Sequence, residues 1–218
     1  FLANKITVQL KSYKKDYPFF LRKKIYVISN ILKDPIKKYK EPNLNSNKVA
    51  MAGRLCEQKN FTPLLNQIKK SNSDKIEVQI AGEGGLRTYL EKEYKELIKI
   101  KTLTLKGNIK NIDSFFSHSA IFCFPSLWEG YPNCLVEALR MGLPIITSKR
   151  MKYLTEFVEN NVNGLILEDN DFLVEIEKLI VDKQRLKYMS LQSHKKYIAL
   201  SERNPIKEWI RLIEGNYH

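Results

Sequence analysis

Two glutamates stand eight positions apart in the stretch SLWEGYPNCLVEALRMGLP, on either side of a Gly-Tyr-Pro turn. The preceding run AIFCFP has the length of a strand, and the residues CLVEALRM after the turn place apolar side chains at helical spacing. Pro132 suits the first helical position because its φ is fixed and it has no N–H to leave unpaired. We therefore expect Glu129 in a turn at a strand's carboxyl end and Glu137 in the next helix, both lining one crevice.

The start of that helix could bind an anion. We expect the N–H groups of Tyr131, Asn133 and Cys134 to be free and to point into the crevice, where the helix dipole adds about half a positive charge. The carboxylates would repel a phosphate that touched them, but each can accept hydrogen bonds from hydroxyl groups beside it. A nucleotide-sugar carries both kinds of group. Ordinary surface helices also carry glutamates, so these two residues alone leave a structural interpretation equally open.

The composition is that of a globular protein: 218 residues, 43% hydrophobic and 28% charged. No apolar stretch has the length of a membrane span, and no signal-peptide pattern occurs. We therefore expect a cytoplasmic protein, with the inner face of the membrane as an alternative place of action. The cysteines Cys56, Cys123 and Cys134 have no C-x-x-C spacing and the three histidines are scattered. We expect no disulfide framework, no metal site and no cofactor.

The net charge of +13 is concentrated near the N-terminus. Residues 1–47 hold eleven Lys or Arg against three acidic residues, a surplus of eight that leaves +5 for the remaining chain. The lysine doublets alternate with Tyr and Phe, yet no RNA-binding or helix-turn-helix signature accompanies them, so we expect no nucleic-acid partner. A docking surface for a missing domain, or for an anionic membrane, explains the patch equally well.

From residue 48 onward, strands and helices alternate six times. The predicted strands are KVAMAG, KIEVQIAG, TLTLKG, AIFCFP, PIITS and GLILE. The helices after them are FTPLLNQIKK, LRTYLEKEYKELI, IDSFFSHS, CLVEALRM, MKYLTEFVEN and FLVEIEKLIV. This alternation predicts an α/β fold with a parallel sheet and helices on both faces, which binds ligands at the carboxyl ends of its strands.

The chain divides into four segments. Residues 1–30 contain a strand, a helix and a strand (NKITVQL, SYKKDYPFFLRK, KIYVIS), a unit too small to fold alone. Residues 31–47 are rich in proline and asparagine, which is typical of a linker. The main domain would span 48–200. In 201–218, NPIKEWIRLIEG predicts an amphipathic helix whose apolar face needs a partner; that face comprises Ile206, Trp209, Ile210 and Ile213.

Two further turns at strand ends could meet the same ligand. In GRLCEQKN, Gly53 permits a tight turn, and Arg54 and Lys59 place two cations where a diphosphate could bind. In AGEGG, Gly82 and Gly84 would let the backbone approach a ligand closely. AGEGG is neither a dinucleotide fingerprint nor a P-loop. A third turn, KGNIKN, could place its backbone against a flat base. Taken singly, GRLCEQKN and KGNIKN are more ordinary as surface turns.

In order, these segments resemble the nucleotide-binding half of the large retaining glycosyltransferase family 4, which has the GT-B fold. GRLCEQKN is similar to the family's Gly-Arg…Lys loop, AGEGG to its Gly-acid-Gly turn, LKGNIKNID to its Gly turn beside the base, and NVNGLIL to its next strand. FPSLWEGYPNCLVEALRMGLPIITS resembles its most specific segment, the E-x7-E motif. The resemblance covers residues 48–182 and implies a Rossmann-like domain. The terminal helix is similar to the one that crosses back to the partner domain.

The resemblance implies a role for each matched residue. Arg54 and Lys59 would hold the diphosphate and stabilise the leaving group, and Glu129 would contact the donor sugar; these three are the expected catalytic residues. Glu137 would accept hydrogen bonds from the ribose. The remaining residues of the expected nucleotide-sugar site are Gly53, Gly82, Gly84, Ile109 (beside the base), Gly130, Tyr131, Pro132 and Asn133.

The resemblance also implies the reaction. A sugar would pass from a nucleoside diphosphate sugar, which we expect to be UDP-linked, to a glycan or lipid-linked acceptor, with retained configuration and without a divalent metal. This chain would be the C-terminal half of the enzyme, and residues 1–30 the end of the N-terminal acceptor domain. We expect the chain alone to transfer little or nothing.

Two features leave other interpretations open. Tyr131-Pro132-Asn133 replaces the family's commoner Phe-Gly pattern, and Trp128 precedes the motif, so the identity of the donor sugar is in doubt. A non-catalytic nucleotide-binding module and an epimerase-like GT-B enzyme remain alternatives. Glu129 argues against the first, because a module that only binds nucleotide needs no carboxylate on the sugar side.

Overall fold

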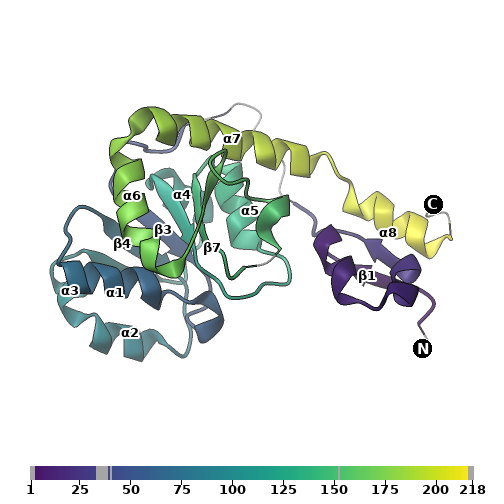
Figure 1. Cartoon of the computed structure of the whole chain (residues 1–218), viewed down its shortest axis with the longest axis horizontal. Coiled ribbons are helices and arrows are strands. Elements are labelled where there is room, and N and C mark those ends of the chain that lie inside the picture. The colour runs from purple at the N-terminus through teal and green to yellow at the C-terminus, as the bar shows by residue number, and fades with distance from the viewer. Residues whose placement is uncertain (1–2, 33–38, 40, 152, 216–218) are drawn as a thin grey trace.

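The computed structural model describes residues 3–32, 39, 41–151 and 153–215 of the chain. They form a large α/β unit and a small N-terminal unit, and the C-terminal helices run from the first to the second (Figure 1). Within the described ranges, no helix is both long and apolar enough to cross a membrane.

The large unit is built on a six-stranded parallel sheet with the order β5-β4-β3-β6-β7-β8. Its strands are β3 (Lys48–Ala52), β4 (Glu77–Ala81), β5 (Leu103–Gly107), β6 (Ile121–Phe124), β7 (Ile145–Ser148) and β8 (Gly164–Leu167). All six predicted strands are confirmed. Every residue of β6 and β7 is buried, which explains the uninterrupted apolar run of β6, since a strand covered on both faces has no polar side.

Helices cover both faces of this sheet. They are α1 (Thr62–Ser71), α2 (Arg87–Glu93), α3 (Lys95–Lys99), α4 (Ile112–Ser117), α5 (Asn133–Arg140), α6 (Phe172–Val181) and α7 (Lys183–Ser201). One buried cluster joins α1, α2 and α6 to the face that carries Met51, and a second joins α4 and α5 to the face that carries Ala50. The predicted arrangement of helices on both faces is therefore confirmed.

The strand order reverses between β3 and β6. From β3 the chain proceeds outward through β4 to β5, and then returns to form β6 on the other side of β3. Ligands of open α/β sheets bind outside the carboxyl ends of the strands at such a switch point. The topology therefore predicts a ligand site at the turns after β3 and β6, residues 53–60 and 125–132.

The prediction of a helix over MKYLTEFVEN is wrong. The chain forms only the 3₁₀ helix η4 (Leu154–Glu156) there, and Lys152 lies outside the described residues. The Asn163 side chain accepts a hydrogen bond from the Glu159 N–H at 2.7 Å and donates one to the Phe157 carbonyl at 2.9 Å. These bonds occupy backbone groups that a continuing helix would need.

Three other helices differ from expectation. The helix predicted over LRTYLEKEYKELI divides at Tyr94 into α2 and α3. Pro132 precedes α5, whose first residue is Asn133. The 19-residue α7 had no sequence signal, because its buried face includes Ser190, Ser193 and His194 and so forms no apolar stripe.

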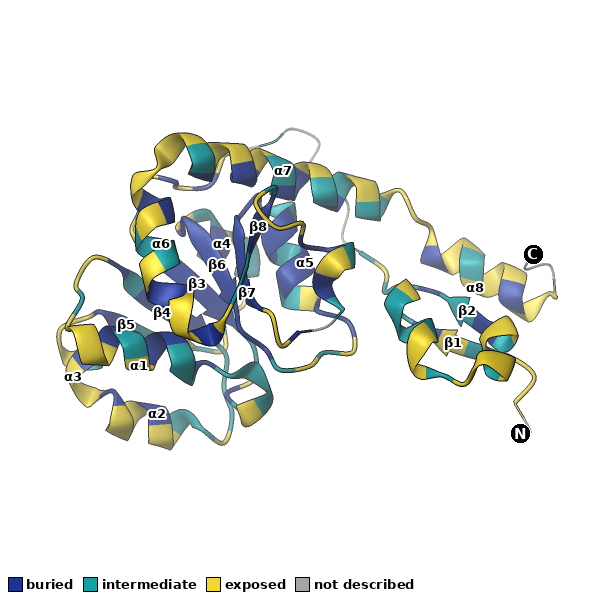
Figure 2. Cartoon of the chain, viewed as in Figure 1, coloured by how far each residue is buried: buried dark blue, intermediate teal, exposed yellow. Residues whose placement is uncertain are grey.

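The small unit pairs β1 (Ile6–Val8) with β2 (Ile25–Val27) in parallel. Two 3₁₀ helices, η1 (Lys11–Asp16) and η2 (Phe19–Lys24), replace the single helix predicted between them. Pro18 holds the residue before it in an extended conformation and so separates them. Helix α8 (Pro205–Ile213) lies beside this unit, with much of its surface exposed (Figure 2). Part of the predicted linker at 31–47 lies outside the described residues.

Candidate functional site

The turns after β3, β4 and β5 are stacked against one another at the carboxyl edge of the sheet. The Gly53 N–H donates to the carbonyl of the last residue of β4 at 2.9 Å, and the Gly82 N–H donates to the Gly107 carbonyl at 2.8 Å. A Cβ on Gly82, at φ +139°, would overlap the Gly53 carbonyl oxygen, and one on Gly84 would lie 2.5 Å from the Leu55 carbonyl oxygen. These glycines let one turn pack on the next, a role that the sequence did not reveal.

An ion pair between Lys59 and Glu129 joins the turn after β3 to the turn after β6. The Lys59 Nζ lies 2.5 Å from Glu129 Oε1, and the two side chains are only 13% and 9% exposed. The ammonium also lies 5.5 Å from the centre of the Phe124 ring. A Cβ on Gly53, at φ +146°, would lie 2.8 Å from Lys59 Cε. Because Gly53 has no side chain, the Lys59 side chain has room to pass beside it and reach Glu129.

Arg54 lies in the same turn as Lys59, but its side chain is exposed. Its guanidinium forms no ion pair or hydrogen bond with the part of the chain that the structure describes. The structure thus places the two predicted cations differently. Lys59 is already paired with a carboxylate, whereas Arg54 is available to an anion from solution.

The start of α5 offers fewer free amides than the sequence predicts. Pro132 has φ −82° and ψ 71°, and the Asn133 N–H donates to the Tyr131 carbonyl at 2.9 Å, so these residues form a tight inverse turn. The Asn133 amide is therefore not free. The Tyr131 ring packs edge-on against Phe157, and burial raises the pKa of its hydroxyl to about 12. Tyr131 and Pro132 are buried, whereas Gly130 before them and Asn133 after them are exposed.

The two glutamates of the motif lie near the same thiol but line different cavities. Desolvation raises the pKa of the Cys134 thiol to about 12, Lys59 opposes this shift, and Glu129 and Glu137 add to it. Glu137 lines a cavity of 560 Å³ with Asn30, Arg140 and Trp209 among its walls. Glu129 lines a cavity of 300 Å³ whose walls include Tyr13, Trp128, Arg150 and Tyr153. The single crevice expected from the sequence is thus divided in two by the start of α5.

The small unit contacts the motif directly. The Tyr13 hydroxyl donates to the carbonyls of Glu129 and Gly130. Burial and the charge of Glu129 raise the pKa of this hydroxyl, so it remains a donor at neutral pH. Asn30 donates to the Asn133 side chain at 2.9 Å. No local sequence signal could reveal these contacts, because the partners are more than 100 positions apart.

A polar cluster around the buried Asp169 supports the neighbouring loop. Asp169 accepts a hydrogen bond from Ser148 Oγ at 2.5 Å and pairs with Arg150 at 3.2 Å. Asn60, which directly follows Lys59, donates to the same carboxylate at 3.4 Å. No group of three or more His, Cys, Asp or Glu suited to a metal ion occurs among the described residues. Ile109, the expected neighbour of the base, is half-buried against the core.

Residues 33–196 match the family model of glycosyl transferases group 1. The UDP-Gal:alpha-D-GlcNAc-diphosphoundecaprenol alpha-1,3-galactosyltransferase of Escherichia coli is 33% identical over 162 residues, which cover 71% of this chain and 41% of that protein. The amylovoran biosynthesis glycosyltransferase AmsD of Erwinia amylovora is 27% identical over 195 residues, or 84% of this chain and 54% of that protein. The chain thus spans about half the length of these relatives.

Solved structures share the fold of nearly the whole chain. The pneumococcal O-GlcNAc transferase GtfA in complex with UDP and GlcNAc superposes with a TM-score of 0.77 at 17% identity, over 98% of this chain and 45% of that one. HepE of Anabaena in complex with UDP also gives a TM-score of 0.77 at 17% identity, over 98% of this chain and 63% of that one.

The Lys59–Glu129 pair should show strong energetic coupling. Glu129→Gln leaves a mostly buried ammonium without its counter-charge and should lower the free energy of unfolding by about 3 kcal/mol. Adding Lys59→Met removes the orphaned charge and should recover most of that loss. Urea unfolding of both single variants and the double variant measures the coupling.

The exposed pair Lys69–Glu93 provides the control, since its side chains are 51% and 42% exposed. Lys69→Met and Glu93→Gln should couple by less than about 1 kcal/mol. Additive effects at Lys59 and Glu129 would show that this ion pair contributes nothing specific to stability.

Proposed function

The chain belongs to the group 1 glycosyltransferases, and we propose that it is the donor-binding half of a retaining enzyme that uses a nucleoside diphosphate sugar. The observation that carries the proposal is the gathering of Lys59, Glu129 and Glu137 around the start of α5, at the switch point of a parallel sheet. A cation for the diphosphate and carboxylates for the hydroxyl groups on either side of it match the chemistry of such a donor.

In the proposed reaction, the bond between the anomeric carbon and the diphosphate oxygen breaks. An acceptor hydroxyl forms its bond to the same face of that carbon and loses its proton, and the diphosphate leaves with added negative charge. Lys59 and Arg54 would stabilise this charge as it develops. Glu129 would hold the sugar hydroxyls and Glu137 the ribose, with Ile109 beside the base. No metal or cofactor takes part in this proposal.

The names of similar proteins support a UDP-linked donor and a glycan or lipid-linked acceptor. The E. coli relative is named for UDP-Gal and a diphosphoundecaprenol-linked sugar, and HepE and GtfA are described in complex with UDP. The AmsD relative belongs to amylovoran biosynthesis. We therefore propose transfer to a growing polysaccharide or to its lipid-linked precursor.

We also propose that a further N-terminal domain completes the enzyme, with residues 1–30 as its last part. The two-stranded sheet of the small unit is too small to be stable by itself. The α8 helix that covers it exposes an apolar stripe of Ile206, Trp209, Ile210 and Ile213. A larger domain around this sheet would bury the stripe and bring the acceptor to the site.

Calorimetric titration with UDP, GDP, UDP-GlcNAc and UDP-GalNAc tests the donor site. We expect binding selective for one base. Glu137→Ala, and Arg54→Ala combined with Lys59→Ala, should each weaken it by about tenfold or more, because each removes charge-assisted hydrogen bonds. Lys95→Ala with Lys99→Ala, two exposed residues of α3, is the charge control. Absence of binding by the folded chain would contradict the proposal that this half binds the donor by itself.

The Tyr13 hydroxyl allows a separate test of the proposed sugar side of the site. It donates a hydrogen bond to the Glu129 carbonyl and not to a residue that we expect to bind the diphosphate. Tyr13→Phe should weaken the binding of the UDP-sugar by about three- to tenfold, which corresponds to the loss of one hydrogen bond. The affinity for UDP should not change. Tyr89→Phe, on the exposed side of α2, is the matched control. Equal losses for UDP and the UDP-sugar would contradict a specific role on the sugar side.

The purified chain should transfer little or no sugar even where it binds donor, because the proposed acceptor domain is incomplete. Incubation with a radiolabelled UDP-sugar and a lipid-linked diphosphate acceptor measures this directly. Robust turnover by residues 1–218 would refute the need for a further domain while leaving the donor assignment intact.

A further inference from the structure

The turn after β3 is divided between the two strands on either side of it. Its first half is bonded to the turn after β4: the Leu55 N–H donates to the Glu83 carbonyl at 2.9 Å, and the Leu55 carbonyl accepts from the Leu86 N–H at 2.9 Å. Its second half is the 3₁₀ helix η3 (Glu57–Lys59). A 3₁₀ helix of three residues is not stable by itself, so the position of Lys59 depends on what η3 contacts.

Gln58 joins η3 to the loop after β6 through both its main chain and its side chain. Its carbonyl accepts a hydrogen bond from the Leu127 N–H at 2.9 Å, and its side-chain amide donates to the Trp128 carbonyl at 2.6 Å. Leu127 and Trp128 directly precede Glu129, and Gln58 directly precedes Lys59. These two bonds therefore join the chain segments that lead into the two members of the ion pair.

Asn60, on the other side of Lys59, makes a second connection. It ends η3 in the left-handed conformation, with φ 50° and ψ 46°, which asparagine adopts more readily than most residues. Its side-chain amide donates to the Pro125 carbonyl at 3.2 Å and to the Asp169 carboxylate at 3.4 Å. Gln58 and Asn60 therefore hold the start of the same loop from the positions before and after the lysine.

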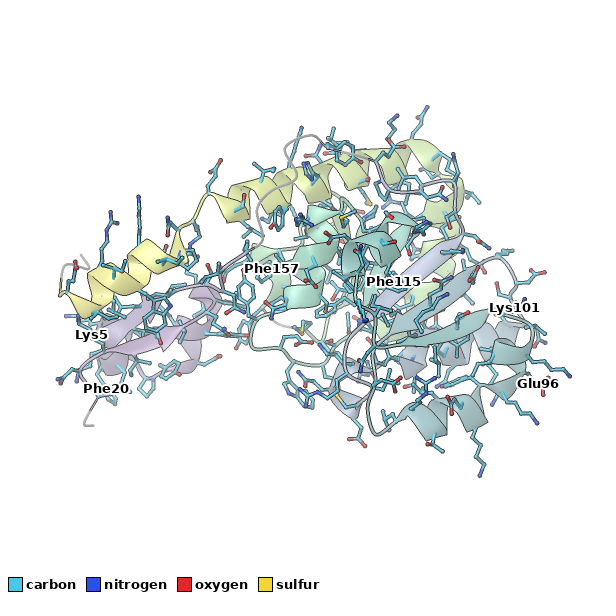
Figure 3. The ribbon with its side chains drawn as sticks, turned by 180° about the vertical axis from the view of Figure 1, so that it is seen from behind. Lys5, Phe20, Glu96, Lys101, Phe115 and Phe157 are labelled. Atoms are coloured by element: carbon cyan, nitrogen blue, oxygen red, sulfur yellow. The ribbon has the colours of Figure 1, made fainter. Side chains whose placement is uncertain are left out.

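The far end of the loop after β6 is held by other contacts. The Tyr13 hydroxyl of the small unit donates to the carbonyls of Glu129 and Gly130. The Tyr131 ring packs on Phe157, which lies on the side of the large unit next to the small unit (Figure 3). These contacts begin at Glu129, so they do not set the distance between η3 and the start of the loop.

We propose that Gln58 and Asn60 are positioning residues of the donor site, which hold the Lys59 ammonium where it meets Glu129 and can also reach a diphosphate. This inference rests on the proposed function. Holding a lysine side chain in one conformation costs entropy, and a fixed turn lowers that cost because less of the chain remains to be ordered. An ammonium has three N–H donors, so its bond to Glu129 leaves donors for a second anion.

Urea unfolding tests this role without a nucleotide. The coupling between Lys59→Met and Glu129→Gln is measured in the unchanged chain, and again in chains that carry Gln58→Met or Asn60→Gly. Gln58→Met keeps the length of the side chain and removes its amide, whereas Asn60→Gly keeps the left-handed conformation. We expect each of these substitutions to reduce the coupling by about half or more, because the ion pair alone must then order the lysine.

Gln67→Met is the matched control. The Gln67 side chain, in α1, donates to the Pro63 carbonyl at 2.9 Å and to the Asp169 carbonyl at 2.7 Å. Its replacement should lower the free energy of unfolding and leave the coupling unchanged, because it does not contact η3 or the loop after β6. An unchanged coupling in Gln58→Met and Asn60→Gly, or an equal loss in Gln67→Met, would overturn the proposal.

The affinities for UDP and UMP provide a second readout. Because Lys59 is proposed to hold the diphosphate, Gln58→Met should weaken UDP binding by about three- to tenfold. The affinity for UMP, which lacks the second phosphate, should change by less than about twofold. Equal losses for both nucleotides would contradict the positioning role. If the unchanged chain bound neither nucleotide, the proposed donor binding would be contradicted, and the coupling would still decide whether Gln58 and Asn60 position Lys59.

Discussion

The ion pair between Lys59 and Glu129 is the contact on which the candidate site depends. It joins turns from two neighbouring strands, β3 and β6, on either side of the point where the strand order reverses. The pair forms because Gly53 leaves room for the lysine side chain and because β3 and β6 are paired neighbours in the sheet, so that the turns after them lie side by side. A methyl group at Gly53 would displace the Lys59 side chain, and the nearly buried Glu129 carboxylate would lose the cation that neutralises it.

The second constraint comes from the small unit. Tyr13 and Asn30 hold the segment from Glu129 to Asn133 from outside the large sheet, so this part of the candidate site is shaped by residues of both units. The start of α5 separates two cavities, one lined by Glu129 and one by Glu137. A ligand that contacted both carboxylates would have to pass around this helix start.

The candidate site and the small unit both carry positive charge. The site combines a paired lysine with an exposed arginine, and helices η1 and η2 of the small unit contain six basic residues. These six residues account for part of the excess positive charge of the N-terminal segment. Polar residues beside the site at the same edge of the sheet have a structural role instead, since Asp169 binds Arg150, Ser148 and Asn60 and so holds the loop after β7.

The sequence by itself determined the six strands, most of their helices and the segments that make up the site, because apolar periodicity and the E-x7-E spacing are local properties. Its pattern predicted a helix over MKYLTEFVEN that does not form, because the Asn163 side chain binds the Glu159 N–H and the Phe157 carbonyl that a helix requires. Nor did it reveal α7, whose buried face is partly polar. Only the tertiary structure decided that Gly53 admits Lys59 and that Tyr13 holds Glu129. The first contact depends on how one turn is packed, the second joins residues 116 positions apart, and no local pattern encodes either.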